Sequence, residues 1–251
     1  MKKFISFSGG VESTTMCVLF GGKANAIFSD TGFEHKIMYE RLHKVEAEIQ
    51  KLHPNFKIIR VKNKKHASLQ EYIKDYKYYP SVMARFCTRI FKIEPIDDYL
   101  RDLGPVELMI GLNADEFGMR TGNHGLVPNV TYSYPLLEAN LARMACISIL
   151  KRLHLEPVFP PYMARGGCIG CFYKSKKEYA AMALLNEEEF DQVIELEEVI
   201  QDERGKHYGI RDGIPNMRDF KRLAKSTLFS AEEMYDYKLE LQTSCGVFCH
   251  R

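Results

Sequence analysis

Short apolar runs alternate with longer helix-like stretches over roughly the first 150 residues, and this alternation constrains the fold more than any other feature. The runs have the length of strands, and the stretches between them carry apolar residues at helical spacing. Such alternation builds a parallel sheet covered by helices on both faces. We therefore predict an α/β fold with an open parallel sheet, whose ligands bind beyond the carboxyl ends of the strands. The expected strands are KFISFS, NAIFSD, NFKIIRV, VELMIGL and a shorter YSYPLL, and the expected helices cover residues 12–20, 35–52, 69–77 and 89–103.

The pattern changes near residue 138, after which the apolar spacing is mostly helical. The stretch EPVFPPYMARGG is rich in Pro and Gly and is the best candidate for a connector. We predict two parts, an α/β domain of residues 1–155 and a mainly helical C-terminal region of residues 156–251. The helices expected after residue 138 are EANLARMACISILKRLHL, KSKKEYAAMALLN, EEEFDQVIELEEVIQDE, MRDFKRLAKS and SAEEMYDYKLELQ.

Composition and charge exclude several classes of protein. The chain has 251 residues, of which 45% are hydrophobic and 27% charged, so it can bury a sizeable core. Its formal net charge of +2 excludes a strongly polybasic nucleic-acid binder but permits a local basic cleft. No apolar run approaches the roughly 20 residues that span a bilayer. We expect a cytoplasmic protein without a membrane partner.

The strand-to-helix turn SFSGGVES is the first candidate site. Gly9 and Gly10 allow positive φ and a close approach of the backbone to a ligand. Ser8 and Ser13 supply hydroxyl groups, and the N-terminus of the next helix presents N–H groups and a positive dipole end. These features favour a phosphate-bearing ligand. The alternative is an ordinary tight turn with Ser13 as a helix cap.

Clustered cysteines form the second candidate site. The chain has seven cysteines and no recognisable export signal. In a reducing compartment, clustered cysteines more often bind metal or take part in chemistry than form disulfides. Cys168 and Cys171 form a C-x-x-C in a glycine-rich turn, and Cys245 and Cys249 lie near the C-terminus. Two such pairs, brought together by folding, supply four thiolates for Zn²⁺ or an iron–sulfur cluster.

Several motifs, taken in order, resemble a known superfamily. SFSGGVES resembles the Ser-Gly-Gly-x-Asp-Ser loop of the PP-loop ATP pyrophosphatases, the adenine nucleotide alpha-hydrolase-like group, with Glu12 where that loop carries Asp. The later motifs resemble the phosphoadenosine phosphosulfate (PAPS) reductase branch of this superfamily, in matching order from about Lys3 to Phe172. They are FSDTGFEHKIMYERL, RFCTRIFKIEPIDDYL, IGLNADEFGMR, YPLLEANLARMACISIL and GGCIGCF.

The resemblance implies a nucleotide site in the first part of the chain. In this superfamily the loop cradles the pyrophosphate of ATP, the α–β bond breaks, and AMP passes to an oxygen of the substrate. Residues 1–155 would then be a PP-loop nucleotide-binding domain that takes ATP and Mg²⁺. Glu12, Arg89, Arg120 and Cys245 would be catalytic. The implied cofactor-binding residues are Ser6, Phe7, Ser8, Gly9, Gly10, Glu12, Ser13, Asp30, Gly111 and Asp115.

The resemblance also implies a [4Fe-4S] cluster. Cys87, Cys168 and Cys171 match the cysteine positions of assimilatory sulfonucleotide reductases, but Phe86 stands where those enzymes have a further cysteine. Cys245 or Cys249 would supply the fourth ligand if the C-terminus folds back. A three-cysteine cluster with one open iron position is a second possibility, and a structural Zn²⁺ clip is a third.

Three functions stay open at this point. The first is an ATP-dependent enzyme that adenylates a substrate oxygen for sulfur or nitrogen transfer, with a nucleobase in DNA or RNA or a small molecule as acceptor. The second is a PAPS/APS (sulfonucleotide) reductase with Cys245 as the nucleophile. The third is a non-catalytic nucleotide-binding module with a zinc clip. Each is compatible with a partner subunit or a homo-oligomer that completes the site.

Overall fold

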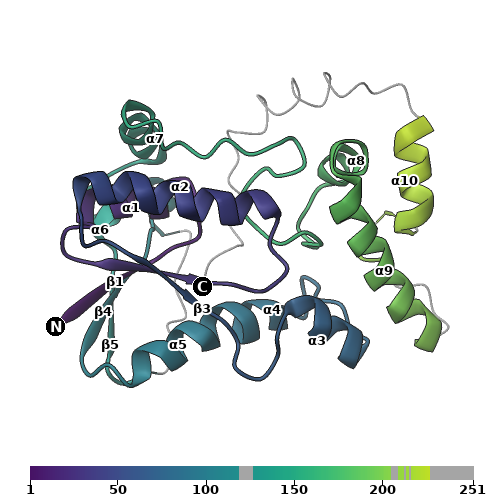
Figure 1. Cartoon of the computed structure of the whole chain (residues 1–251), viewed down its shortest axis with the longest axis horizontal. Helices are drawn as coiled ribbons and strands as arrows, with labels where there is room; N and C mark the ends of the chain where they lie inside the picture. Colours follow the sequence, from purple (N-terminus) through teal and green to yellow (C-terminus); the bar gives the residue numbers. More distant parts are fainter. Residues whose placement is uncertain (119–126, 205–208, 212, 215, 227–251) are drawn as a thin grey trace.

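A five-stranded parallel sheet forms the centre of the protein (Figure 1). The computed structural model describes residues 1–118, 127–204, 209–211, 213–214 and 216–226. The strands follow the order β3-β2-β1-β4-β5, and every neighbouring pair is parallel. This confirms the predicted α/β class. The strands are β1 (Lys2–Ser6), β2 (Asn25–Ser29), β3 (Ile58–Val61), β4 (Val106–Met109) and β5 (Val130–Ser133).

The strand order reverses between β1 and β4. After β1 the chain adds β2 and β3 on one side, and it then crosses to add β4 and β5 on the other. Phe4 therefore pairs with Asn25 of β2 and with Leu108 of β4. The connections leave these two central strands in opposite directions, which opens a crevice at their carboxyl ends. Loops that follow β1 and β4 are thus placed to form a ligand site.

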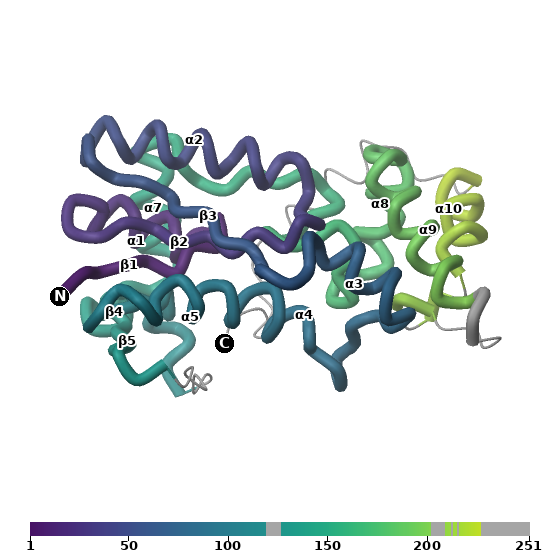
Figure 2. The backbone as a smooth tube through the Cα atoms, turned by 60° about the horizontal axis from the view of Figure 1, so that its bottom comes forward, coloured from purple at the N-terminus to yellow at the C-terminus, as the bar shows by residue number. Residues whose placement is uncertain are grey.

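Helices cover both faces of the sheet, as both views show (Figure 2). Adjacent residues of β1 point to opposite faces: Ile5 packs in a cluster with α1, α2 and α7, whereas Phe4 packs in a cluster with α5. The strands are buried on both sides, which explains their continuous apolar runs. The helices on the first face are α1 (Val11–Phe20), α2 (Lys36–Leu52), the short α6 (Pro135–Glu138) and α7 (Arg143–Arg152), and α5 (Glu94–Arg101) covers the second.

Three sequence expectations need correction. The helix expected over EANLARMACISILKRLHL begins only at Arg143, as α7, because Asn140 has a φ of +50° that a right-handed helix does not accept. The stretch YSYPLL is not one strand, because β5 ends at Ser133 and Pro135 begins α6, where its missing N–H costs no hydrogen bond. The helix expected over 89–103 is divided into a π-helical segment Arg89–Ile93 and α5, and the short α4 (Phe86–Thr88) precedes it directly. Pro95 has no N–H for the α-helical ladder, and the N–H of Glu94 reaches the carbonyl of Arg89 in the π pattern.

A third core cluster joins the C-terminal helices to the α/β part. Phe190 of α9, Tyr179 of α8 and Met217 of α10 are fully buried in one cluster with Ile73 of α3 and with Phe91. The C-terminal helices are therefore packed on the rest of the molecule by apolar contact. Of the helices expected there, SAEEMYDYKLELQ lies outside the described residues. The elements of this part are α3 (Leu69–Tyr76), α8 (Lys176–Leu185), α9 (Glu187–Arg204) and α10 (Met217–Ser226). Among the described helices, none has the length and hydropathy to cross a membrane.

Candidate functional site

The Ser-Gly-Gly loop joins the carboxyl end of β1 to α1. Gly9 has a φ of +73°, which strains any residue with a Cβ atom, and that atom would also displace the Cε of Met38, only 2.8 Å away. Gly10 is the N-cap residue of α1, with extended backbone, and its carbonyl accepts the first helical hydrogen bond from the N–H of Thr14. The first N–H groups of a helix have no partner within the helix, so this turn presents donors at the strand end.

The two serines hold the loop in shape. The N–H of Ser8 donates to the Oγ of Ser13 at 3.3 Å, and the two hydroxyl oxygens are also 3.3 Å apart. Ser13 is buried in the first turn of α1 and is not its N-cap residue, which is Gly10. Upstream, Ser6 ends β1, and the side chain of Phe7 is buried in the core. The loop thus has a rigid base, as a preformed phosphate site requires.

A buried arginine supports the loop from below. The Nε of Arg41 donates to the carbonyl of Gly9 at 2.6 Å, and one Nη donates to the Oγ1 of Thr14 and the carbonyl of Leu155, both at 3.1 Å. Burial lowers the pKa of Arg41 to about 10, which leaves it charged at neutral pH. The guanidinium therefore ties the loop to α2 and to the chain that follows α7.

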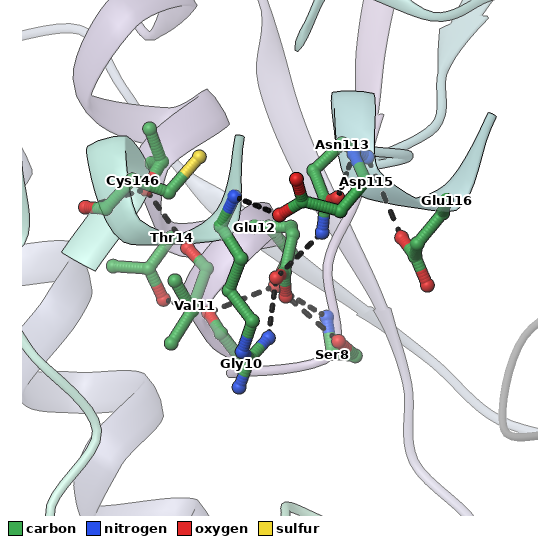
Figure 3. Close-up of polar contacts among 12 residues, drawn as sticks. Ser8, Gly10, Val11, Glu12, Thr14, Asn113, Asp115, Glu116 and Cys146 are labelled. Atoms are coloured by element: carbon green, nitrogen blue, oxygen red, sulfur yellow. Dashed lines mark hydrogen bonds and ion pairs between the residues drawn. The ribbon is translucent and has the colours of Figure 1, made fainter. Parts of the chain in front are cut away.

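Glu12 is held by residues from the loop after β4 and from α7 (Figure 3). Its Oε1 accepts a hydrogen bond from the Nδ2 of Asn113 at 3.1 Å and forms an ion pair with the Nη1 of Arg143. The backbone N–H of Arg143 donates to Asp115 at 2.8 Å, so the carboxylate of Asp115 lies at the N-terminus of α7. A Cβ atom at Gly111 would lie 3.2 Å from the Cβ of Glu12, so the β4 loop passes close to this side chain. The predicted residues Glu12, Gly111 and Asp115 thus meet at the crevice between β1 and β4.

Sequence reasoning missed Asn113 and Arg143. Asn113 forms a capping box with Glu116, and its own side chain accepts from the N–H of Asp115 at 2.9 Å. The spacing of Asn and Glu in NADE was a visible signal for this turn. Arg143 is the first residue of α7 and lies 131 positions from its partner Glu12, so no local pattern indicated their contact.

Asp30 lies just after β2 and is occupied by partners within the protein. Its Oδ1 accepts from the N–H of Gly32 and from the hydroxyl of Tyr39, both at 2.8 Å. Its Oδ2 is 3.3 Å from the Nζ of Lys62, which follows β3. Asp30 is thus a turn-forming residue at the ligand edge of the sheet. Its predicted contact with the nucleotide stays a prediction.

Within the described part of the chain, the basic residues that were predicted to contact the nucleotide or substrate do not lie together in one site. Arg89 is exposed and forms an ion pair with Glu94 at 3.5 Å, whereas Arg85 and Lys92 line a pocket beside the cysteines. Arg120 lies outside the described residues.

Three of the predicted cysteine ligands line one pocket. Cys87 from α4 and both cysteines of the C-x-x-C turn, Cys168 and Cys171, surround a space of about 50 Å³, room for a few water-sized groups. The Sγ of Cys168 lies 3.5 Å from Glu34 Oε1 and 3.5 Å from Thr31 Oγ1. Burial raises the pKa of the Cys87 and Cys168 thiols, and nearby Lys92 opposes this rise. Four cationic side chains share the lining: Arg85, Lys92, Arg165 and Lys174.

The pocket fits the implied metal centre in donor type but not in donor geometry. Thiols are suitable ligands for iron or zinc. Among the described residues, however, no three His, Cys, Asp or Glu side chains are grouped closely enough to hold a metal ion. Cys245 and Cys249 lie outside the described residues. The cluster and the zinc clip therefore stay predictions, and no reaction step is derived through them.

One family model matches a region of the chain that includes the loop and much of the crevice. Residues 2–124 match the phosphoadenosine phosphosulfate reductase domain. This part of the chain is similar to the PAPS reductase-like family. The match supports the PAPS reductase-like branch of the PP-loop superfamily, whose members are generally enzymes, without determining the reaction. The Ser8–Ser13 loop, Asn113 and Cys87 lie inside the matched region, whereas Arg143 and the C-x-x-C turn come after it.

Comparison with solved structures finds a crystal structure of phosphoadenylyl-sulfate (PAPS) reductase from Candida auris in a phosphate complex. The two sequences are 16% identical, the match covers 62% of this chain and 74% of the other, and the TM-score is 0.49. A comparison with curated proteins gives no match.

Proposed function

We propose that this PAPS reductase-like protein is an ATP-dependent enzyme that transfers AMP to an oxygen of an acceptor substrate. The acceptor oxygen attacks the α-phosphorus of ATP, the bond from that phosphorus to the α–β bridging oxygen breaks, and pyrophosphate leaves with the bonding electrons. A sulfur or nitrogen nucleophile from a co-substrate then displaces AMP and ends bonded to the former acceptor carbon or phosphorus. The reaction class is transfer, and ATP supplies the driving force.

The observation that carries the proposal is the position of Glu12 beside the preformed loop. The loop and the N-terminus of α1 favour a polyphosphate. The carboxylate of Glu12 repels phosphate, and its ion pair with Arg143 offsets only part of the negative charge that a polyphosphate brings. A divalent cation between carboxylate and phosphate would offset the rest, and oxygen ligands suit Mg²⁺. Glu12, Asn113 and Asp115 supply such oxygens at the strand ends. The arrangement is therefore suited to a nucleotide that arrives with Mg²⁺.

Each element of the site has a distinct role in the proposed reaction. The backbone at Gly9 and Gly10 and the N-terminus of α1 bind the leaving pyrophosphate. Arg143 holds Glu12 in place through their ion pair, and its positive charge lies near the charge that develops on the leaving group. Arg41 keeps the loop rigid, so little reorganisation is needed when the nucleotide binds.

Nucleotide binding and product identity test the proposal. Binding of Mg²⁺ with the α,β-methylene analogue of ATP, measured by calorimetry, does not need the acceptor. We expect Glu12→Gln to weaken this binding about tenfold or more, a difference of about 1.4 kcal/mol. Glu40→Gln, an exposed change on α2, is the matched control and should leave affinity unchanged. With ATP and a competent acceptor, the products should be AMP and pyrophosphate.

The sulfonucleotide reductase remains a second candidate, because the matched family is named for it and a thiol pocket lies beside basic side chains. Release of sulfite from PAPS or APS with a thiol reductant, without pyrophosphate from ATP, would replace the first proposal by this one. Binding of nucleotide without turnover of ATP, PAPS or APS, together with stoichiometric zinc, would favour the non-catalytic module.

A further inference from the structure

An array of aromatic side chains lies on α3 and on the chain that leads into α4. Tyr72 stacks on Tyr76 with ring centroids 4.3 Å apart and an interplanar angle of 29°. Phe86 continues the array, 5.2 Å from Tyr72 and 5.7 Å from Tyr78. His66 meets Tyr72 edge to face at 4.6 Å. We call these five rings, His66, Tyr72, Tyr76, Tyr78 and Phe86, the aromatic array.

Part of the array and its surroundings face solvent. Tyr76 is 55% exposed and Tyr78 is 42% exposed. The next turn of the chain adds Val82 at 57% and Met83 at 95%. Neighbouring exposed apolar side chains on a folded protein usually mark a binding surface. Rings that already stack on one another at such a surface offer further ring faces to a flat partner.

The same segment carries an unusual share of positive charge. Residues 60–92 contain nine of the 35 Lys and Arg residues but only two of the 33 Asp and Glu residues, a formal charge of +7 in a chain whose total is +2. Lys64 and Lys65, next to His66 of the array, are exposed. Arg89 is also exposed, and its charge lowers the pKa of Tyr72 against the effect of burial, which places it near the array. The surface therefore combines rings with cations and excludes a cationic partner.

We propose that this surface binds single-stranded nucleic acid. Stacking on aromatic side chains and attraction of the phosphate backbone to Lys and Arg are the two components of such binding. The bases of a duplex are already stacked on each other, so they cannot use the rings in this way. An acidic peptide would satisfy the cations but would leave the exposed Tyr rings unused. Single-stranded DNA or RNA uses both.

The surface lies at the same edge of the sheet as the two sites described above. The segment after Lys62 leaves the carboxyl end of β3, and because the strands are parallel this is the edge that also holds the Ser-Gly-Gly loop. Figure 1 shows α3 and α4 beyond this edge. In α4, Phe86 belongs to the array and the next residue, Cys87, lines the thiol pocket. This inference rests on the proposed function and specifies its acceptor class, an oxygen of a nucleobase or of a backbone phosphate in a single strand.

Fluorescence anisotropy with labelled DNA and RNA single strands of about 16 nucleotides tests the proposal without ATP. We expect binding that weakens with salt between about 50 and 200 mM and that exceeds duplex binding. Tyr76→Ala/Tyr78→Ala should weaken single-strand binding about tenfold or more, whereas Tyr76→Phe/Tyr78→Phe keeps the rings and should retain affinity. Lys64→Gln/Lys65→Gln should reduce the slope of log affinity against log salt by about 1.4. Lys44→Gln/Lys51→Gln, on exposed positions of α2, is the charge control and should leave that slope unchanged.

Several results would overturn the inference. They are absence of single-strand binding at low salt, equal binding of duplex, equal affinity of the Ala and Phe variants, or displacement of the strand by polyglutamate as readily as by unlabelled DNA. The experiments distinguish a failure of this inference from a failure of the proposed function. Glu12→Gln should retain strand binding, and the Tyr variants should retain nucleotide binding. Loss of ATP cleavage with intact strand binding would therefore reject only the adenylation proposal.

Discussion

The buried pair of His35 and Glu189 should make the stability of this protein depend on pH. His35 is fully buried at the N-terminus of α2, and its Nδ1 contacts Oε2 of Glu189 in α9. The other carboxylate oxygen accepts from the N–H of Lys36 at 2.9 Å. Burial and the nearby charge of Lys174 lower the pKa of His35, Glu189 and Glu178 oppose the shift, and the resulting pKa is about 4. The native state therefore holds a neutral imidazole that donates from Nδ1 to the carboxylate.

The sign and size of this pH dependence follow from the protonation of His35 in the native and in the unfolded state. In the unfolded chain the imidazole has a pKa of about 6.5, so below this pH the unfolded state binds a proton that the native state does not. The free energy of unfolding should thus fall as the pH drops through about 6.5, and the loss should be complete near the native pKa of about 4. A difference of about 2.5 pH units corresponds to about 3 kcal/mol. That is a large part of a typical total stability of about 5–15 kcal/mol.

Urea unfolding between about pH 7.5 and pH 4.5 measures this dependence. His35→Asn places a non-titrating amide donor near the position of Nδ1, so it should flatten the pH dependence even if the smaller side chain lowers the stability at every pH. His43→Asn, an exposed change on the same helix, is the control and should keep the wild-type slope. Parallel profiles for wild type and His35→Asn, or a wild-type stability that rises toward acidic pH, would refute the reasoning.

Four further changes test the loop and the turn that follows β2. Arg41→Met should lower the free energy of unfolding by about 3 kcal/mol, because the acceptors of the guanidinium lose charged donors, and Lys44→Met on the exposed side of α2 should change it little. Gly9→Ala should lower the free energy of unfolding, measured by thermal unfolding, by about 1–2 kcal/mol, because the φ of this residue is positive. Gly10→Ala should lower it by less than about 1 kcal/mol and should still weaken binding of Mg²⁺ with the ATP analogue. Gly32→Ala, at a φ of +68° with Ser68 only 2.6 Å from the added Cβ, should cost at least as much as Gly9→Ala, and equal melting temperatures for all of these variants would contradict this account.

Local sequence patterns predicted the strands of the sheet well, but they did not predict the π-helical turn or the short helix after β5. Each central strand is a short apolar run bounded by polar or turn residues, so period and length were sufficient to place it. The π-helical turn before Pro95 was not visible, because it depends on which carbonyl a displaced N–H reaches. The helix at Pro135 was missed because its apolar residues continue directly from β5.

The candidate site was predictable only where its signal is local or belongs to a motif. Gly9 has a positive φ, a backbone requirement that a glycine in the sequence indicates directly. The contact between Glu12 and Arg143 and the support of the loop by Arg41 join segments far apart in the chain, and only the folded topology brings them together. Cys87 and the C-x-x-C turn line the same pocket, as the family motif implied, but the pocket also has a lining of cations that the motif did not indicate.

The shared core between α3 and the C-terminal helices has a consequence for biosynthesis. Ile73 and Phe91 are covered by side chains such as Phe190, which the ribosome adds about 100 residues later. At about 5–20 residues per second, the interval is about 5–20 s. During that time the nascent α/β part exposes the apolar face that α8, α9 and α10 cover in the folded protein. We expect this intermediate to be the species that chaperones recognise, and we expect truncations before α9 to aggregate during expression.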